Sequence, residues 1–313
     1  MNSQDVKNAI SGVLVVDKPV GMTSHDVVEA IRRGTGIRRA GHTGTLDPRA
    51  SGVLVILVGP AVRLSEYVSA SDKRYQAIIR LGSSTDTFDA DGKFVQSNQP
   101  VNVTEEQFEK ILKNFEGEIE QTPPPYSAVK VGGRRAYDMA RQGEEVSLEP
   151  RKIQVHHLEV LEWAPPEVVV DVHCSSGTYV RSLANDIGVQ LGTGAYLVGL
   201  RRTKSGRFSL RDATPLRKLQ EAFQAGNWYQ FLIPAAEALA DWPAVELNPD
   251  EVEEVRHGHR VKAAAEAEQP QLVRGVSAAG ELIALMIPAA GEDGSAEWQP
   301  KKVFFTSEAK GEE

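Results

Sequence analysis

The residues with the strongest chemical signal lie in a short stretch, Gly41 to Pro48, with the sequence GHTGTLDP. An Asp-Pro pair usually begins a turn, but Pro48 also favours an extended backbone at Asp47, and glycines on both sides let the main chain approach a ligand closely. An apolar run follows at residues 52–59, which is typical of a fully buried strand. We therefore interpret Asp47 as a catalytic carboxylate on a loop at the mouth of a core strand.

Other candidate sites fail on residue type or on spacing. Residues 36–43 have the glycine spacing of a phosphate-binding loop, but His42 stands where that motif requires a lysine. The pairs His156-His157 and His257-Gly-His259 do not match the spacing of structural zinc sites, so no metal site is predicted. Cys174 is the single cysteine, and its place at the end of an apolar strand favours a buried side chain without chemistry.

Charge is distributed unevenly along the 313 residues. The net charge is -8, and the segment from Glu246 to Glu313 has 14 acidic and 7 basic residues, which leaves residues 1–245 at a net charge of -1. A chain of this charge is not expected to coat nucleic acid non-specifically, but local basic clusters still bind phosphates. The alternative for each cluster is an ordinary solvated face. The clusters are Arg32, Arg33, Arg38 and Arg39; Lys130, Arg134 and Arg135; and Arg201, Arg202, Lys204 and Arg207.

The elements that position these residues follow from periodicity and from capping residues. Thr23 and Ser24 offer caps to a helix with Val27, Val28 and Ile31 inward, and Thr104 with Gln107 forms a capping box for a second helix that Gly117 ends. Thr178 is the expected cap of a third helix, ended by Gly192. Strands are expected at 12–17, 52–59, 75–81, 152–162 and 167–174, with the last two paired around a Pro165-Pro166 turn.

Strands mixed with single helices predict an α+β fold, and the chain length favours two domains. We expect a catalytic domain at 1–244, with a polar insertion at about 124–150 that contains a short helix at 135–142. Short strands with hairpin turns, at 272–276 and 282–287, predict a small β-rich domain at 245–307 that includes a helix at 249–257, and a polar tail at 308–313. The lone cysteine and the lack of a signal sequence or a long apolar span favour the cytoplasm and exclude a membrane association.

Several motifs occur in a fixed order along the chain. They are DKPVG at 17–21, GHTGTLDPRASGVL at 41–54, KRY at 73–75 with DTFDADG at 86–92, YSAVK at 126–130, GTYVRSL at 177–183 and LRR at 200–202. In sequence and order these motifs resemble the bacterial tRNA pseudouridine-55 synthases, the TruB family of pseudouridine synthases. The resemblance covers about residues 12–240 and implies a mixed-sheet catalytic domain followed by a small RNA-binding domain of the PUA type. Residues 300–304 (PKKVF) are similar too, but the acidity of this region departs from the family pattern.

The resemblance implies an isomerase that flips uridine-55 out of the tRNA T loop, breaks its N1 glycosidic bond and rejoins C5 to the same sugar carbon. This reaction has no redox change and requires no cofactor. Asp47 matches the catalytic aspartate, Arg181 matches its partner, which would keep the carboxylate ionised, and Tyr75 matches the active-site tyrosine that lies on the uracil and assists removal of the C5 proton. Whether Asp47 attacks the sugar, adds to the pyrimidine ring or removes a ribose proton stays open.

The resemblance also implies the substrate-binding residues. His42 would fill the space that the flipped nucleotide leaves, and Leu200 would pack on the second side of the base. Lys18 is expected both in the substrate-binding set and, with Pro19, as a support beneath the catalytic loop. The set is completed by Tyr179, Asp89 and Lys130. Candidates for gripping the T arm are Arg32, Arg33, Arg38, Arg39 and the insertion at 124–150.

Two other functions compete with this interpretation. One is a module that binds and remodels tRNA with a vestigial pocket, but a carboxylate such as Asp47 repels RNA and is useful only for catalysis. The other is the guide-RNA-dependent relative that works in a ribonucleoprotein, against which the acidic tail at 308–313 argues. We expect a monomer that needs no protein partner and whose partner is tRNA.

Overall fold

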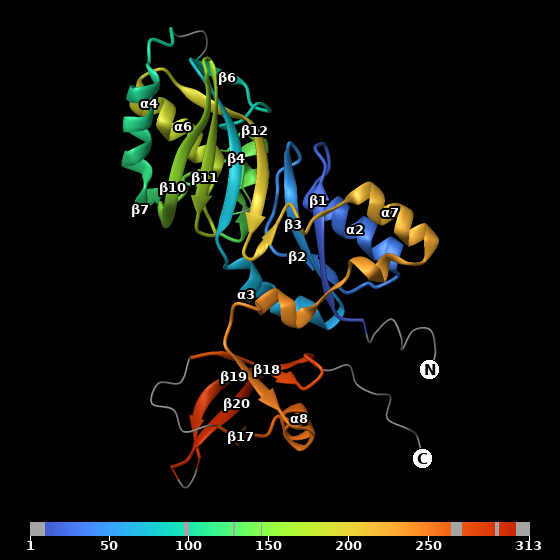
Figure 1. Cartoon of the computed structure of the whole chain (residues 1–313). Helices are drawn as coiled ribbons and strands as arrows, with labels where there is room; N and C mark the ends of the chain where they lie inside the picture. The colour runs from blue at the N-terminus through green and yellow to red at the C-terminus, as the bar shows by residue number, and fades with distance from the viewer. Residues whose placement is uncertain are drawn as a thin grey trace.

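The computed structural model describes residues 10–96, 100–127, 129–144, 146–263, 271–291 and 294–304. The described chain forms one large mixed sheet covered by helices and a second, smaller sheet at one end of the molecule (Figure 1). This arrangement confirms the expected α+β class. The predicted tail at 308–313 lies outside the described residues.

The large sheet has the order β14-β1-β3-β12-β4-β11-β10-β7, and β2, β13 and β15 pair beside this path. β12 is parallel to β3 and antiparallel to β4, so it joins the two halves of the sheet. The strands are β1 (Gly12–Lys18), β2 (Ala40–His42), β3 (Ala50–Val58), β4 (Lys73–Leu81), β7 (Gly117–Gln121), β10 (Arg151–Ala164), β11 (Glu167–Cys174), β12 (Ala195–Ser205), β13 (Phe208–Ser209), β14 (Thr214–Pro215) and β15 (Ile233–Pro234).

The large sheet is buried on both faces at β3, which explains the apolar run in that strand. Leu54 and Ile56 point into one apolar cluster, whereas Val53 and Val55 point into another on the opposite face. The first cluster is covered by α2 (Ser24–Thr35), α4 (Glu105–Leu112), α6 (Val180–Leu191) and α7 (Leu216–Ala225). Figure 1 shows α2 and α7 beside β1 and β3, and α4 and α6 beside β10 and β11.

The predicted helix starts are confirmed for α2 and α4, where Thr23 and Thr104 each form a complete capping box. The expected cap of α6 is wrong by one residue. Tyr179, not Thr178, is the N-cap, and it makes no side-chain capping hydrogen bond. The side chain of Gln121 fixes the backbone of this N-cap residue, because it accepts from the Tyr179 N–H at 2.8 Å and donates to the Tyr179 carbonyl at 3.1 Å.

The second sheet has the order β16-β18-β19-β20-β17 and packs against α8 (Pro249–Arg256), as the sequence predicts for a β-rich unit with one helix. Its residues Leu282, Leu285 and Phe304 belong to the same apolar cluster as Val53 and Val55 of the large sheet. We call this the shared cluster. The strands are β16 (Ala244–Leu247), β17 (Val261–Lys262), β18 (Val273–Ser277), β19 (Leu282–Ala290) and β20 (Ala296–Val303).

Short elements complete the fold. The predicted insertion contains a small hairpin and the expected short helix, and within the described residues no helix is long and apolar enough to cross a membrane. These elements are η1 (Gly59–Leu64), α3 (Ser65–Ser69), β5 (Ser84–Thr85), β6 (Phe94–Gln96), η2 (Lys113–Phe115), β8 (Lys130–Val131), β9 (Arg134–Arg135), α5 (Ala136–Arg141), η3 (Trp228–Phe231) and η4 (Ala235–Leu239).

Candidate active site

The loop that carries Asp47 is held from beneath by two side chains of the preceding elements. Ser24 bonds both backbone groups of Leu46, donating to its carbonyl at 3.0 Å and accepting from its N–H at 2.8 Å. Lys18 is fully buried, and its Nζ donates to the carbonyls of Pro19 at 2.9 Å, Met22 at 2.6 Å and Pro48 at 3.4 Å. The backbone on both sides of Asp47 is therefore fixed before any ligand binds.

Arg202 of β12 holds the first half of the same loop. Its guanidinium is 2% exposed and donates to the carbonyls of Gly44 at 3.0 Å and Val53 at 2.7 Å, with a longer contact to Thr45 at 3.5 Å. Burying a charged group is costly unless its hydrogen bonds are satisfied, and here the carbonyls supply them. This overturns the expectation that Arg202 belongs to a phosphate-binding patch, because its charge faces the inside of the protein.

A buried arginine connects two carboxylates at the surface of the site. Arg181 Nε is 3.1 Å from Asp47 Oδ2, and Arg181 Nη1 is 3.2 Å from Asp89 Oδ2. Its Nη2 donates to the carbonyl of Tyr126 at 3.2 Å, where the insertion begins. The orientation of Asp47 is therefore tied to the β5–β6 connection and to the insertion through one guanidinium.

Asp89 is set in place by its own turn. Its Oδ1 accepts from the Thr87 hydroxyl at 2.6 Å and from the Asp91 N–H at 3.0 Å, which leaves Oδ2 for Arg181. Asp91 in turn forms an ion pair with Arg49, two residues after Asp47. The Arg49–Asp91 ion pair therefore connects the catalytic loop to this turn directly, and Arg181 connects Asp47 to Asp89 as a second link.

Arg181 stands in the first turn of α6, where the helix dipole disfavours a cation. The two carboxylates offset this, and the start of the helix is fixed from β7: Gln121 bonds the backbone of Tyr179, and the Ser182 hydroxyl donates to the Thr122 carbonyl at 2.8 Å. The position of the guanidinium is therefore set by backbone contacts on both sides of it.

A shallow, open pocket lies beside the ion-paired carboxylates. Its polar wall contains Asp47, whose side chain is 44% exposed, and its apolar wall is formed by β12, including Leu200. Register places Leu200 between Ala50 of β3 and Ala77 of β4. The pocket lining consists of Asp47, Arg49, Ala50, Asp89, Arg181, Leu197, Val198, Gly199 and Leu200.

The net electrostatic effect on Asp47 differs from the sequence-based expectation. Burial raises the pKa of Asp47, Arg181 opposes this, and the charge of Asp89 adds to the increase. The result is a pKa above the ordinary value for aspartate. Arg181 does favour the ionised form, as expected, but desolvation of the carboxylate is the larger effect.

Tyr75 and His42 lie near the pocket without lining it. Tyr75 is 8% exposed on β4, in register with Arg202, and burial raises the pKa of its phenol, with Asp47 among the charges that act on it. His42 ends β2, so the loop predicted from Gly41 begins two residues later, at Thr43. Burial, with the charge of Arg202 next, lowers the pKa of His42, and its Nδ1 accepts from the Gly44 N–H at 3.4 Å.

Three other residues that were expected to bind substrate do not line the pocket. Tyr179 lies at the start of α6, and Lys130 is exposed on β8 of the insertion, away from the pocket lining. Lys18 does not fit a direct substrate contact, because it is fully buried beneath the loop. Desolvation lowers its pKa to about 8. Its position fits the other expected role, support of the catalytic loop.

The glycine next to the loop also differs from the expectation. Gly52 adopts a φ of +99°, and a Cβ there would lie 2.2 Å from the Arg202 carbonyl oxygen. Its missing side chain therefore allows β3 to pair with β12 and does not serve ligand approach. Cys174 is buried, as expected, and burial raises its pKa to about 11, so its thiol stays protonated.

Sequence reasoning missed the positioning residues Ser24, Arg49 and Gln121. Ser24 was interpreted only as a possible helix cap, whereas its hydroxyl bonds the backbone of Leu46. Gln121 precedes the Thr-Pro-Pro-Pro stretch and has no local pattern of its own. Their contacts join segments that are far apart in the chain, and the spacing of residues in the sequence does not predict such contacts.

The chain is similar to known proteins both in sequence and in fold. A family model described as TruB family pseudouridylate synthase (N terminal domain) matches residues 32–180, and one described as tRNA pseudouridylate synthase B C-terminal domain matches 181–240. A protein of Symbiobacterium thermophilum named tRNA pseudouridine synthase B is 46% identical over 257 residues, 81% of this chain and 84% of the relative. One of Synechococcus sp. (strain WH7803) with the same name is 43% identical over 305 residues, 96% of this chain and 98% of the relative.

Among solved structures, a chain from the crystal structure of a Cbf5-Nop10-Gar1 complex is similar over both sheets. It has a TM-score of 0.74 and 30% identity, over 96% of this chain and 87% of that chain. The similarity therefore includes the second sheet, which lies beyond the residues that the two family models match.

Proposed function

Because the chain belongs to the TruB family of pseudouridylate synthases, we propose that it converts uridine-55 in the T loop of tRNA to pseudouridine. The enzyme is an isomerase, since the base leaves through N1 and returns through C5 to the same sugar carbon. The observation that supports this most directly is the pocket itself, in which one carboxylate held by a guanidinium faces an apolar wall. That arrangement suits a neutral, planar base attached to a sugar.

Asp47 is the proposed catalytic residue. Its side chain is partly exposed at the pocket mouth, so the carboxylate can reach a nucleotide that has been flipped out of its stack. Breaking the glycosidic bond leaves the sugar carbon short of electrons, and a carboxylate there can stabilise or capture it. The proton at C5 has to leave after the new C–C bond forms, to solvent or a nearby base, and N1 takes up a proton in exchange, so the product is an isomer of the substrate.

Arg181 and Asp89 are proposed to orient Asp47 and to set its proton affinity. The guanidinium holds the Asp47 carboxylate from its Nε and is itself anchored to Asp89 and to the Tyr126 carbonyl. An aspartate on a loop would otherwise sample several rotamers. A fixed orientation is worth large factors in rate when the reacting atoms must align.

The residues proposed to hold the base lie on neighbouring strands. Leu200 forms the apolar wall of the pocket and can pack on one face of the uracil. Tyr75, on the adjacent strand β4, is proposed to meet the other face once the base enters, and His42 to fill the gap in the T loop. Tyr179 and Lys130 are proposed to contact the surrounding RNA.

The T arm is proposed to lie across the insertion and the end of α2. Arg33, Arg38 and Arg39 are exposed there, whereas Arg32 is engaged with Glu29 and the Ala40 carbonyl. The basic cluster in the insertion is coupled to the site because Tyr126, at its base, accepts from Arg181. Phosphate contacts would position the tRNA, and the pocket would select the base.

We propose that residues 245–307 form the PUA-type RNA-binding domain and that the enzyme is a cytoplasmic monomer without a required protein partner. Although residues 300–304 match the family, Lys302 is directed inward, since it forms an ion pair with Glu66 and lies 5.1 Å from the Tyr67 ring centroid. RNA contact by this domain would therefore use other residues. The chain is 46% identical to a relative named tRNA pseudouridine synthase B and 30% identical to the chain from the Cbf5-Nop10-Gar1 complex, which supports action without such a complex.

The test is pseudouridine formation in an unmodified tRNA transcript, mapped by position, with the purified protein alone. The wild type is expected to modify the T-loop uridine, and Asp47→Asn to lose activity by several orders of magnitude while binding tRNA at least as tightly, because a negative charge facing RNA is removed. Asp241→Asn is the matched control, since it removes an exposed carboxylate that lies outside the pocket lining and is not among the charges that act on Asp47.

Each other outcome selects a different function. Tight tRNA binding without product from the wild type would refute catalysis and favour the RNA-remodelling module. Product that appears only after a guide RNA or a partner protein is added would favour the ribonucleoprotein relative. Equal activity of Asp47→Asn and wild type would remove Asp47 from the mechanism.

A further inference from the structure

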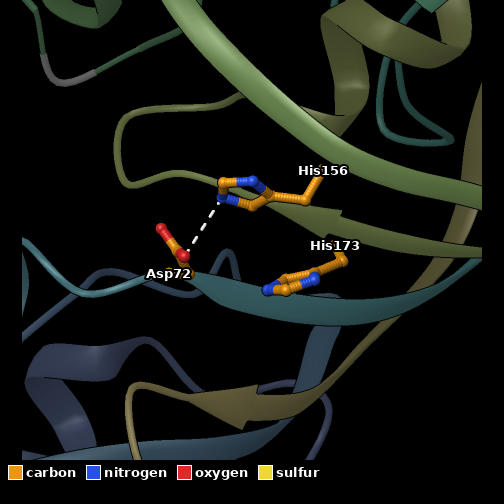
Figure 2. A group of neighbouring side chains, drawn as sticks. All are labelled: Asp72, His156 and His173. Atoms are coloured by element: carbon orange, nitrogen blue, oxygen red, sulfur yellow. Dashed lines mark ion pairs between the residues drawn. The ribbon is translucent and has the colours of Figure 1, made fainter. Parts of the chain in front are cut away.

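A second group of chemically active side chains lies outside this site, where the loop before β4 meets β10 and β11. Asp72, His156 and His173 each offer one ligand atom, and these atoms all lie within 4.8 Å of one another. His156 Nε2 is 3.0 Å from Asp72 Oδ2, and the rings of His156 and His173 have centroids 4.7 Å apart. Figure 2 shows the three side chains approaching one another from separate segments.

A β-bulge brings the two imidazoles together. In the β10–β11 ladder Val155 faces Cys174 and His157 faces His173, so the register shifts at His156, which is the extra residue. A bulge bends its strand and redirects a side chain. His156 lies against the ring of His173 as a result, whereas His157 forms ion pairs on another side of β10.

Asp72 is held at the same place by its backbone and by its neighbour. Its carbonyl accepts from the Gly206 N–H at 2.9 Å, which attaches the loop to the end of β12. Lys73 is buried, and its Nζ donates to the carbonyls of Ser69 and Ser71. The backbone of all three residues is therefore fixed by strand pairing or by hydrogen bonds. Only their side chains have to rotate for the three ligand atoms to come closer together.

The donor set selects the kind of ligand. Two imidazole nitrogens and one carboxylate oxygen suit borderline metals such as Zn²⁺, whereas Mg²⁺ and Ca²⁺ prefer oxygen alone. Metal–ligand bonds of about 2.0–2.2 Å place ligand atoms about 3.3 Å apart in a tetrahedron. The Asp72–His156 distance is already close to this, and the His173 nitrogen, which lies within 4.8 Å of both atoms, has to move closer by rotation of its side chain.

The surrounding charge does not prevent a cation from binding. Arg74 and Lys204 both act on His173, but Arg74 Nε is 2.8 Å from Asp171 Oδ2, so its charge is largely balanced. The side chains of Asp72 and His156 are 49% and 33% exposed, so a metal ion can enter from solvent.

We propose that Asp72, His156 and His173 form a binding site for Zn²⁺, with three protein ligands and a fourth position open to water. The ion would join the start of β4 to β10 and β11. Tyr75 is on β4, three residues after Asp72, so a bound ion would also stiffen the strand next to the pocket. The site is separate from the proposed reaction and does not depend on it.

The experiment is a zinc titration of the full-length, tag-free protein after treatment with a chelator, followed by calorimetry and repeated with Co²⁺ to record its visible absorption. We expect one equivalent to bind, with His156→Asn and His173→Asn each weakening the affinity more than about tenfold. His157→Asn is the matched control, because this neighbouring histidine makes only ion pairs with Glu116 and Glu159. A double variant, His257→Asn with His259→Asn, tests the other histidine pair.

Several results would overturn the site. They are the absence of saturable binding, equal affinity in wild type and both ligand variants, or loss of binding only in the His257 and His259 double variant. A rise in melting temperature with zinc is expected in the wild type and not in His173→Asn. Should a variant fail to fold, Co²⁺ broadening of ring NMR signals in the wild type decides: broadening of His156 and His173 supports the site, and broadening confined to His257 and His259 refutes it.

Discussion

At the scale of single residues, the carboxylate of Asp47 is governed by opposing neighbours. Desolvation raises its pKa, Arg181 lowers it, and Asp89 raises it. If the ionised form is the active one, activity falls as the pH drops through this pKa, and the fall occurs at a higher pH than for an ordinary aspartate.

Asp89→Asn is therefore expected to move the acidic limb of the pH–rate profile to lower pH, because one of the charges that raise the Asp47 pKa is removed. Maximal activity should also decrease, since Arg181 loses an anchor. The measurement is single-turnover pseudouridine formation across pH, with Asp241→Asn as the control, because Asp241 is exposed and is not among the charges that act on Asp47. A limb that moves to higher pH would contradict the electrostatic reading of the site.

At the scale of elements, β12 contributes both to the pocket and to the support of the catalytic loop. It supplies the apolar wall through Leu200 and the internal support of the catalytic loop through Arg202. Gly52 on β3 allows the close approach of the two strands at this point. A single strand therefore determines both the shape of the pocket and the path of the loop.

Arg202→Met is expected to leave the carbonyls of Gly44, Thr45 and Val53 without their donor, at a cost of about 1–3 kcal/mol for each unsatisfied group. A shift of the loop by about 1 Å would lower the rate about a hundredfold. Arg201→Met is the matched control, because Arg201 is 40% exposed and its pair with Asp17 is worth at most about 1 kcal/mol.

Chemical denaturation and single-turnover rates check this. A loss of stability without a loss of rate in Arg202→Met would show that the loop keeps its path unaided. Equal effects of the Arg201 and Arg202 variants would show that burial of the guanidinium is unimportant.

Capping residues and apolar runs correctly predicted the elements whose pattern lies within one continuous stretch of sequence. The capping boxes at Thr23 and Thr104 and the apolar run of β3 are of this kind. β12 was not predicted, because the stretch AYLVGLRRTKS combines charges with a glycine and shows no strand alternation. Arg202 becomes compatible with a central strand only because carbonyls from another segment surround its guanidinium, and the sequence does not show that.

The residues of the site also divide into those that the sequence predicts and those that only the tertiary structure brings together. Asp47 was inferred from its loop and from the family motifs, and Arg181 and Asp89 from the motifs alone. That the guanidinium bonds both carboxylates is a result of tertiary structure. The group of Asp72, His156 and His173 was missed because its members are far apart in the chain and depend on a bulge in β10.

At the scale of the whole molecule, the shared cluster joins the two sheets. Leu285 of β19 is fully buried in it, together with Val53 and Val55 of β3. Arg63 extends the contact, since it donates to the Val303 carbonyl and lies over the Phe304 ring. An apolar interface of this kind resists independent motion of the two units.

Leu285→Ala is expected to destabilise the protein by about 2–5 kcal/mol and to lower a single unfolding transition in calorimetry. Leu161→Ala on β10, where the side chain is 46% exposed, should change stability little. Two separate transitions, with only the lower one moved by Leu285→Ala, would show that the sheets unfold independently.

The place of β12 in the sheet also determines when the protein can fold during its synthesis on the ribosome. β3 and β4 lie within residues 10–194, but β12 (Ala195–Ser205), the strand that lies between them and pairs with both, is made later. Until then the nascent chain presents two open strand edges, which are prone to pair with other chains. Arg202 is part of the same segment, so the synthesis of β12 both joins the two halves of the sheet and supplies the internal support of the catalytic loop.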